Sequence, residues 1–187
     1  MSLLGRAALL LALAAAVYAL VMALGSRRGG RRAWQESAER GVYAVFALTT
    51  LAIATMWAGL LTDAFELRNV AEYTSSTLGA QYKITALWGS QAGSLLLWAW
   101  IFSGFSSLAV YTNRARNREL MPVVVAVLMV IALFFLGLLS FVTSPFETLA
   151  AVPAEGRGLN PLLQNFYMQI HPPLLYLGYV GLTIPWA

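Results

Sequence analysis

Long apolar runs separated by short polar segments dominate the chain. Four of these runs have close to the ~20 residues that a helix needs to cross a bilayer; they are residues 3–25, 42–61, 92–111 and 121–142. A fifth apolar run, 172–187, has only 16 residues. The pattern predicts an all-α integral membrane protein with four complete transmembrane helices and the incomplete start of a fifth. We expect residues 1–187 to be one multi-pass membrane domain and a fragment of a longer protein.

Composition supports this interpretation, because 59% of the residues are hydrophobic and 11% are charged, against about 25% charged in soluble domains. Arginines concentrate in two polar segments: Arg27, Arg28, Arg31, Arg32 and Arg40 lie in 26–40, and Arg114, Arg116 and Arg118 lie in 112–120. The positive-inside rule places both segments in the cytoplasm. The N-terminus and the segments 62–91 and 143–171 then face outside. The basic segments carry no nucleic-acid-binding motif, so we expect contact with the lipid bilayer and no nucleic acid.

The first outer segment ends in an aromatic and glycine-rich stretch, Trp88-Gly-Ser-Gln-Ala-Gly-Ser-Leu-Leu-Leu-Trp98. Gly89 and Gly93 form a small-xxx-small pair, which lets a helix or a flat ligand approach the backbone. Trp88 and Trp98 suit a membrane interface. Two interpretations follow, a helix-packing motif with an aromatic belt or a surface for a planar cofactor, and the motif alone does not decide between them.

The second outer segment contains a helix start at Asn160-Pro161, with Asn as the N-cap and Pro at the first helical position. Apolar residues then recur on one face, at Leu162, Leu163, Phe166, Tyr167 and Ile170. We predict a short interfacial amphipathic helix over residues 160–170, on the outer face. A new helix is expected to begin at Pro172-Pro173, since proline is tolerated in a first turn.

His171 is the only histidine, and there is no cysteine. It is either an ordinary interfacial residue or a metal ligand, and without an Asp/Glu/His cluster a zinc site is not expected. A haem needs an axial ligand, an apolar slot and cationic partners for its propionates. His171 is the candidate ligand and the Trp88–Trp98 stretch a candidate surface. Arg157, and more weakly Lys83 and Arg68, are candidate propionate partners or solvated charges.

Two motifs together resemble the CcmF/NrfE haem lyase family, which is related to the CcsA haem-handling proteins. They are the Trp88–Trp98 stretch and Gly158-Leu-Asn-Pro-Leu-Leu-Gln-Asn-Phe-Tyr-Met-Gln-Ile-His-Pro-Pro-Leu-Leu-Tyr-Leu-Gly-Tyr-Val-Gly181. The resemblance covers the whole chain in order. Ser90 and Ala92 depart from the family pattern, in which Gly and a polar or acidic residue are expected.

The resemblance implies a multi-pass protein of the bacterial inner membrane that functions in cytochrome c maturation. Such proteins receive haem, b-type before attachment, from the chaperone CcmE. CcmH-type partners hold apocytochrome c, and the family's proteins attach the haem to its Cys-x-x-Cys-His motif. His171 would be one of two axial ligands on the periplasmic side. The second ligand and the family's tryptophan-rich domain lie beyond this chain.

Two hypotheses therefore remain. In the first, the chain supplies a haem ligand as one component of a haem lyase and is inactive alone. In the second, it is a membrane scaffold that docks the haem chaperone and apocytochrome partners, while the haem chemistry belongs to a missing C-terminal part. A transporter fragment is disfavoured, because no acidic residue lies inside a predicted span.

Overall fold

A computed structural model describes residues 1–29 and 32–186 of the chain. Helices and short helical turns follow one another along the described residues, without a named strand. The helices are α1 Ser2–Gly29, α2 Arg32–Leu61, α3 Arg68–Tyr73, α4 Ala80–Thr85, α5 Gln91–Asn113, α6 Met121–Gly137 and α7 Phe166–Thr183. The short turns are η1 Ala86–Gly89, η2 Leu138–Val142, η3 Pro161–Leu163 and η4 Ile184–Trp186.

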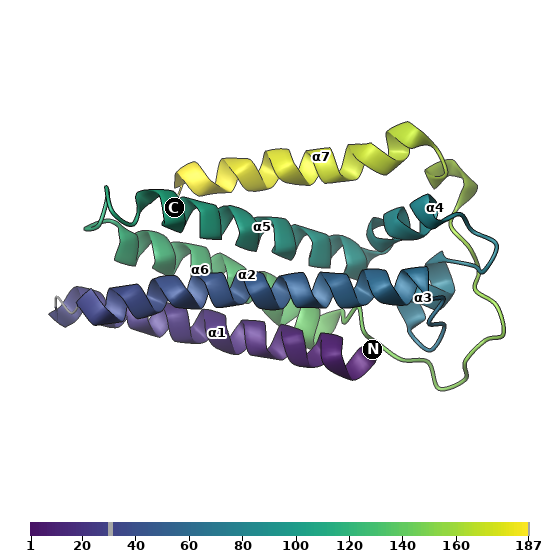
Figure 1. Ribbon diagram of the computed structural model, residues 1–187, viewed down its shortest axis with the longest axis horizontal. Helices are drawn as coiled ribbons and strands as arrows, with labels where there is room; N and C mark the ends of the chain where they lie inside the picture. The colour runs from purple at the N-terminus through teal and green to yellow at the C-terminus, as the bar shows by residue number, and fades with distance from the viewer. Residues whose placement is uncertain (30–31, 187) are drawn as a thin grey trace.

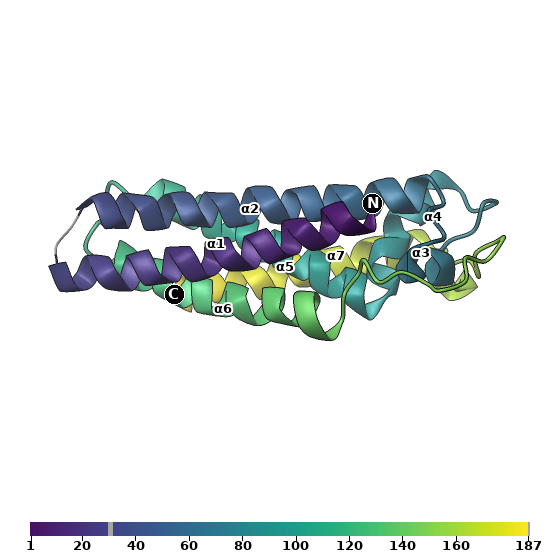
Figure 2. The ribbon, with the colours of Figure 1, turned by 90° about the horizontal axis from the view of Figure 1, so that it is seen from below.

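Four long helices, α1, α2, α5 and α6, run along the long axis of the molecule (Figures 1 and 2). Within the described residues, these four are long and apolar enough to cross a membrane when α6 is taken together with η2. The all-α membrane fold expected from the apolar runs is therefore confirmed. Helix α7 lies along α5, and the short helices α3 and α4 gather at the end of the bundle that holds the N-terminus (Figure 1).

Small residues on one face of α1 let α2 approach closely. Buried alanines recur every three or four residues along α1, at Ala8, Ala12, Ala16, Ala19 and Ala23. A Cβ on Gly41 of α2 would lie only 2.6 Å from the Ala19 Cβ. Lipid tails are as apolar as side chains, so close packing of small residues drives helix association in a membrane.

Hydrogen bonds between side chains join α2 to α5. The hydroxyls of Thr49 and Ser103 lie 2.8 Å apart, both buried. Trp100 Nε1 donates to Thr50 Oγ1 at 2.9 Å. Such bonds satisfy polar groups that would otherwise lie in an apolar medium, and they fix the register of the two helices.

The basic segment 26–40, expected as a loop, is helical over its described residues. Helix α1 continues to Gly29 and α2 already begins at Arg32, ten residues before the predicted span. Arginine, alanine, glutamine and glutamate are all good helix formers. Arg32 also pairs with Glu36 one turn later, at 2.8 Å. The charged residues described in this segment therefore lie outside the apolar runs, but they are still part of the helices α1 and α2.

The predicted amphipathic helix over 160–170 is divided in two. The Asn160 side chain accepts from Leu162 N at 3.0 Å, as expected of an N-cap, but the turn it caps ends at Leu163. A second cap follows, because Asn165 Oδ1 accepts from Tyr167 N at 3.0 Å and starts α7. Two asparagine caps five residues apart favour two separate helix starts.

Pro172 and Pro173 therefore lie inside α7, and the expectation that a helix begins there was wrong. The two prolines remove the i→i−4 bonds that would reach the carbonyls of Met168 and Gln169. Such losses are tolerated in membrane helices when neighbouring groups compensate. As a consequence, His171 belongs to the second turn of α7.

Candidate functional site

His171 is exposed near the N-terminal end of α7, at the same end of the molecule as α3 and α4 (Figure 1). Tyr167, His171 and Leu174 follow each other at i, i+4 and i+7 and so share one face of the helix. Together with Phe166, Met168 and Ile170, they line a shallow hollow of about 380 Å³. An accessible imidazole in an apolar setting can ligate a metal or a haem iron.

The chemistry around His171 is otherwise sparse. Within the described residues, no group of three or more His, Asp or Glu side chains could hold a metal ion. Phe166 and Tyr167 are 66% and 77% exposed, so the hollow offers aromatic surface and not carboxylates. This donor set fits a ligand that brings its own equatorial ligands, as a porphyrin does, and does not fit zinc.

Trp98 lies on the opposite side of α7 from His171. Its indole stacks on Tyr176, with ring centroids 5.4 Å apart, and contacts Phe135 of α6 at 5.2 Å. Tyr176 and the buried Val180 mark the face of α7 that is covered by α5. Val180 follows His171 by nine residues, half a turn out of phase at about 100° per residue. The two family motifs thus meet at Trp98–Tyr176, while His171 faces away.

Gly89 and Gly93 have packing roles within the chain. A Cβ on Gly93 would overlap the carbonyl oxygen of Leu87, and Gly93 N donates to the N-cap Ser90 Oγ at 2.9 Å. This close approach allows η1 to turn directly into α5. A Cβ on Gly89 would lie 3.2 Å from Leu159 Cδ1, so Gly89 is one of the positions at which the two outer segments touch.

Trp88 is half-buried beside these glycines, and its carbonyl accepts from Ser94 Oγ at 3.0 Å. The stretch from Trp88 to Trp98 therefore matches the helix-packing interpretation in its contacts. The geometry does not gather Trp88, Gly89, Gly93 and Trp98 into one surface with His171.

Two of the three candidate propionate partners are engaged with carboxylates. Lys83 is buried and donates to the Asp63 carboxylate at 2.7 and 2.5 Å. Arg68 pairs with Glu147 at 3.0 Å, and both of these side chains are about half exposed. The side chain of Arg157 is exposed, whereas its backbone N donates to Ala71 O at 2.8 Å.

A tether that the sequence did not suggest holds the second outer segment. The Glu155 carboxylate accepts from Ser76 N at 2.8 Å and from Ser76 Oγ at 2.5 Å. These hydrogen bonds, and a third from Gly156 N, hold the pKa of Glu155 below its usual value. Gly158 N also donates to Thr74 O at 2.9 Å. The segment is thus fixed on α3 and the turn after it, and seven residues, 159–165, lie between Gly158 and the start of α7.

Comparisons with known proteins place this arrangement in context. A family model described as "Cytochrome C assembly protein" matches residues 88–187. The chain is 36% identical over 185 residues to the cytochrome c-type biogenesis protein CcmF of Pseudomonas fluorescens, which covers 98% of this chain and 28% of that relative. It is 40% identical over 147 residues to the probable cytochrome c-type biogenesis protein NrfE of Escherichia coli K12, which covers 77% of this chain and 26% of the relative.

The fold agrees with a solved structure titled "Cytochrome c Heme Lyase CcmF". The TM-score is 0.83 at 29% identity, over 99% of this chain and 29% of the other. The chain therefore spans about 28% of the length of the first curated relative that it matches. On the family match over more than half of its residues, this chain belongs to the cytochrome c assembly protein family, as its resemblance to CcmF and NrfE predicted.

Proposed function

We propose that this chain handles haem during cytochrome c maturation and that His171 is one axial ligand of the haem iron. The observation that most supports this is the exposed imidazole on an apolar, partly aromatic hollow at one end of the bundle. The relatives' names tie the family to cytochrome c biogenesis, and one solved structure is titled a haem lyase. Attachment of haem to apocytochrome c would be an activity of the longer protein that the relatives represent.

The residues around His171 fit one side of a haem. Phe166, Tyr167 and Leu174 offer the apolar surface that a porphyrin face requires. Arg157 remains the candidate for a propionate contact, because Lys83 and Arg68 are paired with Asp63 and Glu147. A single histidine provides one axial ligand, so a second histidine ligand would come from outside this sequence. Bound haem would supply the group that becomes linked to the apocytochrome thiols.

The distribution of arginines supports one orientation in the membrane. The connection between α5 and α6 and the start of α2 lie at the end of the bundle opposite α3 and α4 (Figure 1). The connection carries Arg114, Arg116 and Arg118, and α2 begins with Arg32. Arginine-rich ends remain in the cytoplasm during insertion. We therefore place His171 and the N-terminus on the periplasmic side of the bacterial inner membrane, where the haem chaperone CcmE, CcmH-type proteins and apocytochrome c would meet it.

Replacement of His171 tests the ligand role. In membranes that contain the complete maturation machinery, His171→Ala should lose the Soret absorption of the haem bound at this site, and added imidazole should restore it. Tyr179→Ala is the matched control, since Tyr179 is also exposed on α7 but lies two turns away. Unchanged Soret absorption and unchanged cytochrome c yield in His171→Ala would exclude His171 as an axial ligand.

A docking role is the second candidate, supported by exposed apolar side chains on the second outer segment. Val152 and Leu162 are 60% and 79% exposed. A Val152→Ser/Leu162→Ser variant should lose co-purification of CcmE or CcmH-type partners while it keeps the haem absorption. Retained partners in this variant would argue against docking through the segment and would leave the haem proposal unaffected.

A further inference from the structure

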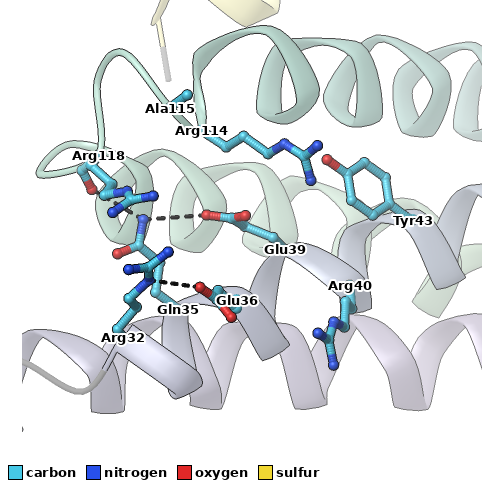
Figure 3. A pocket seen from close by; sticks show the side chains of 9 residues that line it. All are labelled: Arg32, Gln35, Glu36, Glu39, Arg40, Tyr43, Arg114, Ala115 and Arg118. Carbon is cyan, nitrogen blue, oxygen red and sulfur yellow. Dashed lines mark hydrogen bonds and ion pairs between the residues drawn. The ribbon is translucent and has the colours of Figure 1, made fainter.

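A basic pocket lies at the end of the bundle opposite His171, where the first turns of α2 meet the connection between α5 and α6 (Figure 3). Its volume is about 270 Å³. Glu39 and Tyr43 of α2 lie in its wall, and Arg114 and Arg118 of the connection lie across from them. The pocket takes no part in the haem site, which is at the other end of the molecule (Figure 1).

Hydrogen bonds hold the walls of this pocket in place. Gln35 Nε2 donates both to Glu39 Oε1 at 3.2 Å and to the backbone carbonyl of Arg118 at 3.1 Å. One amide therefore ties the connection to α2. Because these groups are positioned without any ligand, a ligand that enters does not have to order them.

The pocket carries more positive than negative charge. Four arginines line it against two carboxylates, and of the four only Arg32 forms an ion pair within the part of the chain that the structure describes, with Glu36. Glu39 is buried and its carboxylate is engaged by Gln35. Arg114 lies over the Tyr111 ring, 5.1 Å from its centroid, and extends toward Tyr43 (Figure 3). Neither Arg114 nor Arg118 forms an ion pair with a carboxylate in the described part of the chain, so both guanidinium groups can bind an added anion.

Tyr43 carries an unused hydrogen-bond donor within the wall of this pocket. Its Oη is buried and has no hydrogen-bond partner among the described residues. Buried polar groups in native structures are nearly always paired, so an orphaned hydroxyl calls for a partner. Beside Arg114, the partner that the charge favours is an anionic oxygen.

An apolar groove lies one helical turn further along α2, between α2, α5 and α7. Phe46, one turn after Tyr43 on α2, lines it together with Ile101, Gly104, Phe105 and Leu108 of α5. The groove has a volume of about 270 Å³ and is almost wholly apolar. The order along α2, with a basic pocket at Tyr43 near the end of the bundle and an apolar groove at Phe46 one turn further in, matches a phosphate head and an acyl chain. A free phosphate ion would leave the groove unused.

We propose that the basic pocket binds the phosphate of an anionic phospholipid, with Arg114 and Arg118 as its charge partners and Tyr43 Oη as a hydrogen-bond donor. Basic pockets between membrane helices on the cytoplasmic side commonly hold such headgroups. The acyl chain lies in the groove beside Phe46.

Lipid binding to the full chain tests this proposal. Purified protein in detergent is titrated with phosphatidylglycerol, with phosphatidylcholine and with inorganic phosphate, and bound lipid is counted by native mass spectrometry. Phosphatidylglycerol should bind more tightly than phosphatidylcholine. Arg114→Gln and Arg118→Gln should each weaken it about fivefold, and Tyr43→Phe, which keeps the ring, about threefold.

Arg116→Gln is the matched control, since Arg116 lies on the same connection but does not line the pocket. It should leave phosphatidylglycerol binding unchanged. The proposal is overturned if Arg116→Gln weakens binding as much as Arg114→Gln, because the effect would then be general surface charge. It is also overturned if Tyr43→Phe has no effect, if phosphatidylcholine binds equally well, or if inorganic phosphate displaces the lipid at equal concentration.

Discussion

The indole of Trp98 stacks on the phenol ring of Tyr176, with the ring planes 29° apart, and this contact ties α5 to the covered face of α7. We expect Trp98→Ala and Tyr176→Ala each to destabilise the protein in mixed micelles, with a coupling between them of about 1 kcal/mol in a double-mutant cycle. Tyr176→Phe keeps the ring and should be nearly neutral. Additive effects of the two alanine variants would show that the stacking contributes nothing.

The turn from η1 into α5 depends on Gly93. A methyl group there would overlap the Leu87 carbonyl, which is backbone and cannot rotate away. Gly93→Ala should therefore lower the unfolding free energy by about 3 kcal/mol or more. Gly137→Ala is the control, because a Cβ there meets no atom within 4 Å. It should be neutral or stabilising by up to about 1 kcal/mol, since alanine is the better helix former.

The Asp63–Lys83 ion pair is the most buried in the described part of the chain, with side chains 24% and 8% exposed. Lys83→Met should cost about 3 kcal/mol, because it leaves the Asp63 carboxylate without its partner. The double variant Lys83→Met/Asp63→Asn should recover most of the loss. Asparagine also tolerates the positive φ of 55° at position 63.

The half-exposed pair Arg68–Glu147 provides the comparison for this experiment. Arg68→Met should cost about 1 kcal/mol or less, as is usual for surface ion pairs. Thermal unfolding in detergent measures the loss of stability in each of these variants. An equal loss in Arg68→Met and Lys83→Met would contradict the role of burial.

The tether between Glu155 and Ser76 is expected to depend on pH. The pKa of Glu155 is lowered in the folded protein, so its contribution to stability is present above about pH 4.5 and is lost as the pH falls below that value through the folded pKa. The protection of the amides around residue 155, measured against their intrinsic hydrogen-exchange rate at each pH, should fall in this window. Glu155→Gln should exchange faster at neutral pH and show no such step; a step that persists in Glu155→Gln would assign it to another group.

The membrane-spanning core could be predicted from the sequence because apolar runs of about 20 residues have few other uses. Helix ends were less predictable. The predicted span begins at residue 42 because the preceding segment, 26–40, is rich in arginine, although charged residues propagate a helix well. The predicted length of the helix after Asn160 was wrong for a local reason. Gln164 ends the first helical turn, and Asn165 caps the start of the next helix.

Candidate site residues could be named from the sequence, but which of them lie close together could not. His171 follows from its being the single histidine, and its exposure agrees with a ligand role. His171 faces away from Trp98 because of the side of α7 that packs on α5. The contacts of Tyr176 and Val180 determine that side, and they are not visible in the sequence. The Ser76–Glu155 tether joins residues 79 positions apart, and neither residue carries a local sequence signal.

The backbone anchor at Gly158 also sets a limit on reach. Only residues 159–165 separate that anchor from the first residue of α7, and a fully extended chain of seven residues covers about 24 Å. Three of them, Pro161–Leu163, are already wound into a turn. Any movement of α7 away from α5 is therefore limited by this short connection, and the imidazole of His171 can reach only positions close to α3 and α4.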